Sequence, residues 1–171
     1  LDALLLSTSE TLLHKNYPDI LRLAEDSEIM DQFLFTNGTL LNEKNSNIIL
    51  KSSLTRLFIS IDAVTNDTYD KVRIPVNKKI INTNRIEQIE TNVKNFMKLR
   101  NSLGKKIPLV RVSFVALKTN QHEIDAFIKK WENIVDSVEI QKESSIDFYK
   151  EFDDSVDSAN EKKLKKYNCN Q

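Results

Sequence analysis

Polar side chains follow each of five short apolar runs in this chain, at the positions where a strand would end. They are Ser9 and Glu10, Thr36 and Asn37, Ser60 and Asp62, Asn120, and Gln141. Carboxylates, hydroxyls and amides can hold a charged small molecule through hydrogen bonds. Ligands of α/β folds bind beyond the carboxyl ends of the strands, so these positions are candidates for one binding site.

Glu10 has two interpretations from its surroundings. Its carboxylate could receive an ammonium group of a ligand. Alternatively, Ser7-x-x-Glu10 fits a capping box, in which the serine hydroxyl and the glutamate carboxylate satisfy backbone N–H groups at a helix start. The two roles are compatible, and both stay open at this point.

A second set of polar residues lies inside the apolar runs and shares one predicted face. Successive strand residues point to opposite sides, which separates the aliphatic positions of three runs from a polar set. That set is Ser60, Asp62, Arg111, Ser113, Glu139 and Gln141. An unpaired buried arginine costs several kcal/mol, so we expect a wet concavity that holds a ligand. The alternatives are one exposed sheet face, or a structural ion pair between Arg111 and Glu139.

Five predicted strands alternate with five predicted helices. The strands are expected at Asp2–Ser7, Gln32–Thr36, Arg56–Ala63, Leu109–Leu117 and Ser137–Gln141. The helices are expected at Pro18–Asp26, Ser46–Ser53, Asp67–Val72, Arg85–Leu103 and Gln121–Val135, the last capped by Asn120 or Thr119. This alternation indicates a parallel α/β sheet, either a partial barrel or an open doubly wound sheet.

Composition excludes several classes of protein. The 171 residues carry 25 basic and 25 acidic side chains, so no charge excess indicates nucleic acid as an obligatory partner. No apolar run reaches the roughly 20 residues of a membrane span. The single cysteine, Cys169, forms no internal disulfide, which favours a cytoplasmic setting, and the two histidines lack zinc-site spacing. Residues 1–142 form the predicted α/β unit, and residues 143–171 a charged linker.

Five stretches together resemble a known family. They are "LLLSTSETLLHKNYPDILRLAED", "FLFTNGTLL", "LFISIDAVTNDTYDKVR", "IPLVRVSFVALKTNQHEIDAFIKKW" and "VDSVEIQ". In order and spacing they resemble the central portion of radical S-adenosylmethionine (radical SAM) enzymes, in the SPASM-type subgroup. The resemblance implies a partial parallel (β/α)6 barrel over residues 1–142. It also implies that the first strand, with its Cys-x3-Cys-x2-Cys loop, and the C-terminal auxiliary-cluster extension are missing from this chain.

The resemblance also implies cofactors and site residues. The cofactors are S-adenosylmethionine and a [4Fe-4S] cluster, whose three thiolates this chain does not supply. Cofactor-binding positions carried over are Ser9, Glu10, Thr36, Asn37, Ser60, Asp62, Arg73 and Arg111; substrate-binding positions are Glu139 and Gln141; Cys169 is a candidate auxiliary-cluster ligand. Thr8-Ser9-Glu10-Thr11 stands where the family has Gly-Gly-Glu-Pro, so only the glutamate is kept.

Each carried-over role has a plainer alternative. Arg73 could be a solvated charge at a helix end, Thr36 and Asn37 an ordinary turn, and Cys169 an incidental terminal residue.

The expected function is that of a fragment of a cytoplasmic radical SAM oxidoreductase or maturase. The parent enzyme would cleave S-adenosylmethionine and abstract hydrogen from a peptide, protein or carbohydrate-like substrate, with electrons from a flavodoxin or ferredoxin. The chain as given would be inactive. The alternative is a degenerate, non-catalytic barrel that binds a peptide or nucleotide. A third possibility, an aldolase-like enzyme, would need a strand lysine for a Schiff base, and no predicted strand has an interior one.

Overall fold

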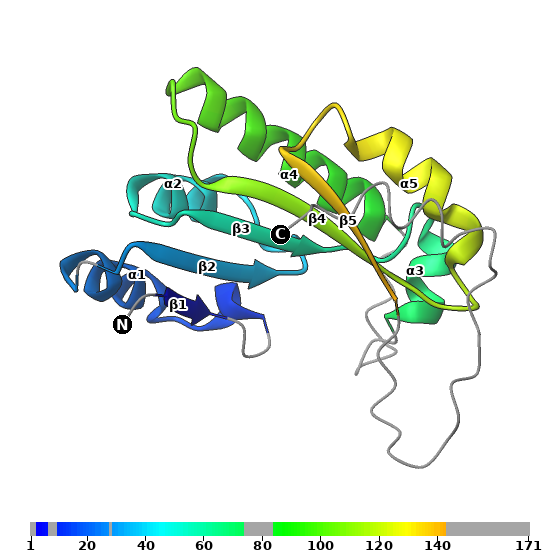
Figure 1. The fold of residues 1–171 in the computed structure, drawn as a ribbon, viewed down its shortest axis with the longest axis horizontal. Helices are drawn as coiled ribbons and strands as arrows, with labels where there is room; N and C mark the ends of the chain where they lie inside the picture. Colours follow the sequence, from blue (N-terminus) through cyan, green and yellow to red (C-terminus); the bar gives the residue numbers. More distant parts are fainter. Residues whose placement is uncertain (1–2, 7–9, 28, 74–83, 143–171) are drawn as a thin grey trace, which may run out of the picture.

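A computed structural model describes residues 3–6, 10–27, 29–73 and 84–142. Within them, one sheet contains five parallel strands in the sequential order β1-β2-β3-β4-β5 (Figure 1). The strands are β1 (Ala3–Leu6), β2 (Asp31–Thr36), β3 (Arg56–Ser60), β4 (Leu109–Ala116) and β5 (Ser137–Lys142). All four neighbouring pairs are parallel, as the alternation of elements predicts.

The connections between strands are helical. They contain α1 (Tyr17–Asp26), α2 (Glu43–Lys51), α3 (Asn66–Val72), α4 (Arg85–Ser102) and α5 (Ile124–Trp131), with short 3-10 helices η1 (Thr11–Leu13) and η2 (Gln121–Glu123). None of the described helices is long and apolar enough to cross a membrane. The predicted linker at residues 143–171 lies outside the described residues.

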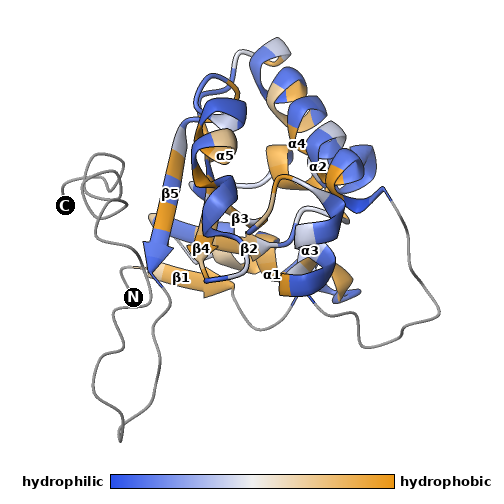
Figure 2. Ribbon diagram, turned by 90° about the vertical axis from the view of Figure 1, so that its right-hand side faces the viewer, coloured by the Kyte–Doolittle hydropathy of each residue, from blue (hydrophilic) through white to orange (hydrophobic). Residues whose placement is uncertain are grey.

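The helices lie on one side of the sheet (Figure 2). The strand face beneath them is buried and apolar; its residues include Leu34, Leu57, Ile59, Val110, Val112, Phe114 and Ile140, all at most 1% exposed. Doubly wound folds cover both faces of a sheet and reverse the strand order at a switch point. Sequential order with helices on one side is instead the arrangement of a (β/α) barrel segment.

The uncovered face changes character along the strands. Strand register aligns side chains across the sheet in rows. Ala3 and Asp31 pair at the strand starts, and the row after them is Leu5, Phe33, Arg56 and Leu109. The next row is Phe35, Phe58, Arg111 and Ser137, and the one after it contains Ser60, Ser113 and Glu139. This face is therefore apolar and aromatic toward the amino ends of the strands and polar toward the carboxyl ends.

Element boundaries differ from the predictions by more than one residue in three elements. β3 ends at Ser60 rather than Ala63, because Asp62 takes a left-handed backbone conformation with φ of 62°. α2 begins at Glu43, three residues before the predicted Ser46, because the Asn42 side chain accepts a hydrogen bond from the Asn45 N–H at 3.0 Å. The helix predicted at Gln121–Val135 is divided into η2 and α5 and ends at Trp131.

Candidate functional site

Glu10 joins the loop after β1 to the carboxyl end of β2. Its Oε1 accepts from the Thr36 hydroxyl at 2.7 Å and its Oε2 from the Asn37 N–H at 2.7 Å. Oε1 also accepts from the Leu12 N–H at 3.3 Å, so Glu10 is itself the N-cap residue of η1. The capping box was therefore wrong, because it requires Glu10 three residues inside a helix rather than at its start. Ser7 and Ser9 lie outside the described residues.

The Thr36-Asn37-Gly38 turn is organised by side-chain hydrogen bonds. The Thr36 hydroxyl accepts from the Gly38 N–H at 3.1 Å, and Asn37 Oδ1 accepts from the Thr39 N–H at 2.9 Å. The turn alternative for Thr36 and Asn37 thus describes their local geometry. Asn37 is half-buried, and its backbone N–H is the group that contacts the Glu10 carboxylate.

Two hydroxyls meet at the carboxyl ends of β3 and β4. The Ser60 and Ser113 oxygens are 3.2 Å apart, and the two residues are register partners on the uncovered face. Ser113 is buried and Ser60 half-buried. A hydroxyl pair of this kind can bind a vicinal diol such as a ribose, because each oxygen can both donate and accept.

Asp62 and Arg73 form an ion pair next to these hydroxyls. Arg73 Nε and Nη2 donate to Asp62 Oδ2 at 3.0 and 2.5 Å, and Asp62 Oδ1 accepts from the Val115 N–H at 2.8 Å. The Asp62 side chain is 6% exposed and that of Arg73 36%. Arg73 is thus paired rather than a solvated helix-end charge, and its remaining donors are accessible.

Asn120 is a buried polar centre of the same edge. Its side-chain nitrogen donates to the carbonyls of Asp62 and Val115, both at 2.9 Å, and its oxygen accepts from the Leu117 N–H at 2.7 Å. Asn120 is the N-cap residue of η2, as predicted, but its side chain makes no capping hydrogen bond. A capping motif and an inter-loop bridge use the same residue type, so the sequence did not distinguish them.

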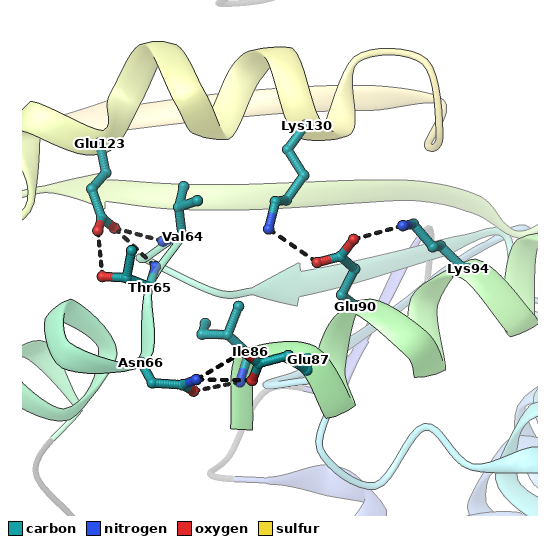
Figure 3. Close-up of polar contacts among 9 residues, drawn as sticks. All are labelled: Val64, Thr65, Asn66, Ile86, Glu87, Glu90, Lys94, Glu123 and Lys130. Carbon is teal, nitrogen blue, oxygen red and sulfur yellow. Dashed lines mark hydrogen bonds and ion pairs between the residues drawn. The ribbon is translucent and has the colours of Figure 1, made fainter. Parts of the chain in front are cut away.

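Glu123 was missed by the sequence analysis, although it links two loops of the edge. Its carboxylate accepts from the Val64 N–H and the Thr65 hydroxyl, each at 2.6 Å (Figure 3). Burial raises the pKa of Glu123, but the hydrogen bonds from Thr65 and Val64 outweigh it and leave that pKa below its usual value. Glu123 lies in η2, after β4, and nothing in the local sequence predicts its partner Thr65, which is 58 residues away.

Arg111 and Glu139 pair across β4 and β5. Arg111 Nη1 lies 3.4 Å from Glu139 Oε2, and its guanidinium stands over the Phe58 ring at 4.9 Å. Gln141 Nε2 donates to the same Glu139 oxygen at 2.8 Å. The structural ion pair considered from the sequence is therefore present, and it neutralises both charges on the uncovered face.

The predicted polar set does share one face, as strand alternation requires. Ser60, Arg111, Ser113, Glu139 and Gln141 are all on the uncovered side, and Asp62 anchors the loop above them. Within the described residues this is a partly exposed sheet face rather than an enclosed concavity. The exposed-face alternative therefore describes the part of the chain that the structure defines.

The described residues contain no group of three or more His, Cys, Asp or Glu side chains that could hold a metal ion. Cys169 lies outside these residues. The set at the carboxyl edge can instead bind a small charged molecule: one carboxylate at Glu10, two hydroxyls at Ser60 and Ser113, and the accessible part of the Arg73 guanidinium.

Comparison with solved structures finds the same fold in Streptococcus suis SuiB. Three SuiB crystal structures align with this chain. The TM-score is 0.65 for SuiB alone, 0.65 for SuiB bound to S-adenosylmethionine and 0.66 for SuiB bound to the precursor peptide SuiA. Sequence identity is 19% in each case, over 96% of this chain. The chain spans about a third of the length of SuiB, 34 to 35%. No protein-family model and no curated protein matches the sequence.

Proposed function

We propose that this chain is the central barrel portion of a radical SAM enzyme of the SPASM-type subgroup that modifies a peptide. The observation that carries the proposal is the sequentially ordered parallel sheet with one uncovered, partly polar face, which has the fold of SuiB. SuiB binds S-adenosylmethionine and a precursor peptide. The family resemblance of the sequence supports the same assignment independently of the fold.

The carboxyl edge fits part of S-adenosylmethionine. Glu10 offers a carboxylate for the amino group, with one lone-pair direction left beyond its three hydrogen bonds. Ser60 and Ser113 offer hydroxyls for the ribose, and the outer donors of Arg73 suit the carboxylate of the ligand. In this proposal Thr36 and Asn37 hold Glu10 in place, while Asp62 orients Arg73.

The described residues do not fit the [4Fe-4S] cluster, because they include no group of thiolates or histidines able to bind it. The proposal therefore requires three cysteines from a part of the protein outside these 171 residues. When bound, the cluster and S-adenosylmethionine supply the radical chemistry. This chain positions the cofactor and, through the uncovered face with Arg111, Glu139 and Gln141, a substrate. The electron donor would be a flavodoxin- or ferredoxin-like protein in a cytoplasmic setting.

One experiment tests the enzyme assignment and the role of Glu10 separately. The full-length protein is reconstituted anaerobically with iron and sulfide, and S-adenosylmethionine binding is measured by equilibrium dialysis. We expect iron uptake, and at least about tenfold weaker binding in Glu10→Gln, because a hydrogen bond to a charged group contributes roughly 1.5–3 kcal/mol. Glu25→Gln, an exposed change on α1, is the matched control.

The two possible failures have different meanings. No iron uptake, together with no Cys-x3-Cys-x2-Cys in the gene upstream of Leu1, would reject the radical enzyme. Iron uptake with unchanged cofactor affinity in Glu10→Gln would reject only the role of Glu10.

A non-catalytic binding module is the second candidate function. Two observations favour it: Thr8 and Ser9 replace the family's glycines, and the carboxylate of Glu10 and the guanidinium of Arg73 already have protein partners. Side chains at the glycine positions restrict how closely a ligand approaches the backbone. Retained peptide or nucleotide binding in a full-length protein that takes up no iron would support this candidate.

A further inference from the structure

The amino-terminal half of the uncovered face carries three aromatic rings. Phe33 and Phe58 are stacked with centroids 5.9 Å apart, and Phe35 lies 4.7 Å from Phe58. All three are only half-buried, and Leu5 and Leu109, which share a row with Phe33, are 59% and 49% exposed. We call Phe33, Phe35 and Phe58 the aromatic platform. An exposed apolar surface of this kind is typical of a site where a protein segment or a ligand packs.

Arg56 is held over this platform without a carboxylate partner. Its guanidinium stands 5.2 Å from the centroid of Phe33, and among the described residues it has no ion pair and no hydrogen-bond acceptor. Arg111, its counterpart over Phe58, is by contrast paired with Glu139. Stacking fixes the plane of a guanidinium and leaves its N–H groups pointing outward, which suits an incoming carboxylate.

The sequence following β5 has the complementary composition. Residues 143–157, ESSIDFYKEFDDSVD, contain six acidic residues, one lysine and three aromatic residues. The segment follows Lys142 at the end of β5, and β5 is separated from β3 only by β4. Crossing from β5 to β3 requires about 10 Å, and returning along a strand about 20 Å. Phe148 and Phe152 lie six and ten residues beyond Lys142, so an extended chain carries them up to about 20 and 34 Å. The direct distance from the end of β5 to the platform is about 22 Å, which Phe152 can span.

We propose that residues 143–157 dock on the aromatic platform of their own chain, with Phe148, Tyr149 and Phe152 supplying the apolar contact and acidic side chains pairing with Arg56. Docking here covers the apolar half of the open face and leaves the polar carboxyl edge accessible. The segment would thus be a wall of the barrel rather than a solvated linker. This inference goes beyond the proposed function, because the platform lies at the opposite end of the strands from Glu10 and Ser60.

Limited trypsin digestion of the intact chain tests the docking. The rate of cleavage after Lys150, followed by mass spectrometry, reports the fraction of time the segment is undocked when docking is fast. We expect Phe148→Ser/Phe152→Ser and Arg56→Gln each to increase that rate by about tenfold or more, since each removes a buried contact or an ion pair. The segment-side variant cannot disturb the sheet, which separates docking from misfolding.

The rate of cleavage after Lys150 also defines the control and the results that would contradict the proposal. Arg22→Gln, an exposed change on α1, should leave the rate unchanged. Arg56→Lys, which keeps the positive charge, should retain more protection than Arg56→Gln if the charges meet. Equal cleavage rates in the wild type and both undocking variants would overturn the proposal. Protection that increases with protein concentration would also overturn it, because the segment would then belong to a second copy.

Discussion

At the residue scale, the charged side chains of this protein act as ties between loops and strands. Glu10, Asp62 and Glu123 each accept backbone N–H groups from an adjacent connection, and Asp136 does the same with the Val110 N–H at 2.7 Å. A buried N–H without an acceptor costs roughly 1–3 kcal/mol, so each carboxylate stabilises a junction that secondary structure leaves open. The candidate site is built on three of these ties.

Asp136 gives a prediction about pH. Burial raises its pKa, but hydrogen bonds from Arg100 and the Val110 N–H, with the Arg100 charge, outweigh burial and lower it. A lowered folded-state pKa means that the stabilisation is complete above the unfolded value, near 3.9, and is lost as pH falls through the folded value.

We therefore expect Asp136→Asn to lose about 2–3 kcal/mol of unfolding free energy at pH 7, because the Arg100 side chain, 7% exposed, keeps its charge without its partner. The variant should also lose less stability than the wild type between pH 6 and about pH 3. Urea unfolding at both pH values measures this. An identical pH dependence in the two proteins would contradict it.

At the element scale, the turn after β2 depends on close packing between a strand and a helix. Gly38 has φ of 78°, and a Cβ placed there would lie 3.1 Å from Cγ2 of both Ile59 and Ile89. The glycine therefore allows α4 to approach β3 at this point. Asn92 of α4 strengthens the approach by donating to the Gly38 carbonyl at 2.9 Å.

Gly38→Ala should destabilise the protein by about 2–4 kcal/mol, from backbone strain together with overpacking. Gly104→Ala is the matched control: its φ is 65°, but no atom lies within 4 Å of the added Cβ. We expect the control to cost about 1 kcal/mol, from backbone strain alone. Thermal and urea unfolding of both variants measures the difference. Equal losses would mean that the contact with Ile59 and Ile89 contributes nothing.

At the scale of the whole molecule, the sheet is stabilised mainly from one side. Phe127 is fully buried between the helices and the sheet, 5.0 Å from the Phe114 ring. Phe35 lies on the uncovered face and is only half-buried. The two phenylalanines have equal transfer free energies, so any difference between them reports how completely each face is covered.

Phe127→Ala should cost about 3–5 kcal/mol and Phe35→Ala about 1–2 kcal/mol, because packed helices and the sheet enclose Phe127, whereas Phe35 has only its strand neighbours and the surface-docked segment around it. The measurement is the unfolding free energy of each variant from urea denaturation in the full chain. A loss for Phe35→Ala as large as that for Phe127→Ala would show that the platform is as deeply covered as the core.

Local sequence determined the elements and their faces. The alternation of apolar and polar residues placed Leu57 and Ile59 under the helices and Ser60 on the opposite side, because the two-residue period of a strand is a local property. The 3.6-residue period located α4 to within one residue of its observed end. Cys169, Ser9 and the segment 143–171 lie outside the described residues, so the roles predicted for them stay predictions.

Only the tertiary structure decided how the polar residues are used. Both a partial barrel and a doubly wound sheet agreed with the alternation of elements, since each helix could have packed on either side; the sequential strand order and the single helical layer selected the barrel segment. Asn120 and Glu10 stand at the N-cap positions of η2 and η1, but the fold also uses their side chains to join loops to neighbouring strands. A hydrogen-bonding side chain takes whichever partner the folded chain brings near it, and those partners, Thr36 for Glu10 and Asp62 for Asn120, are distant in sequence.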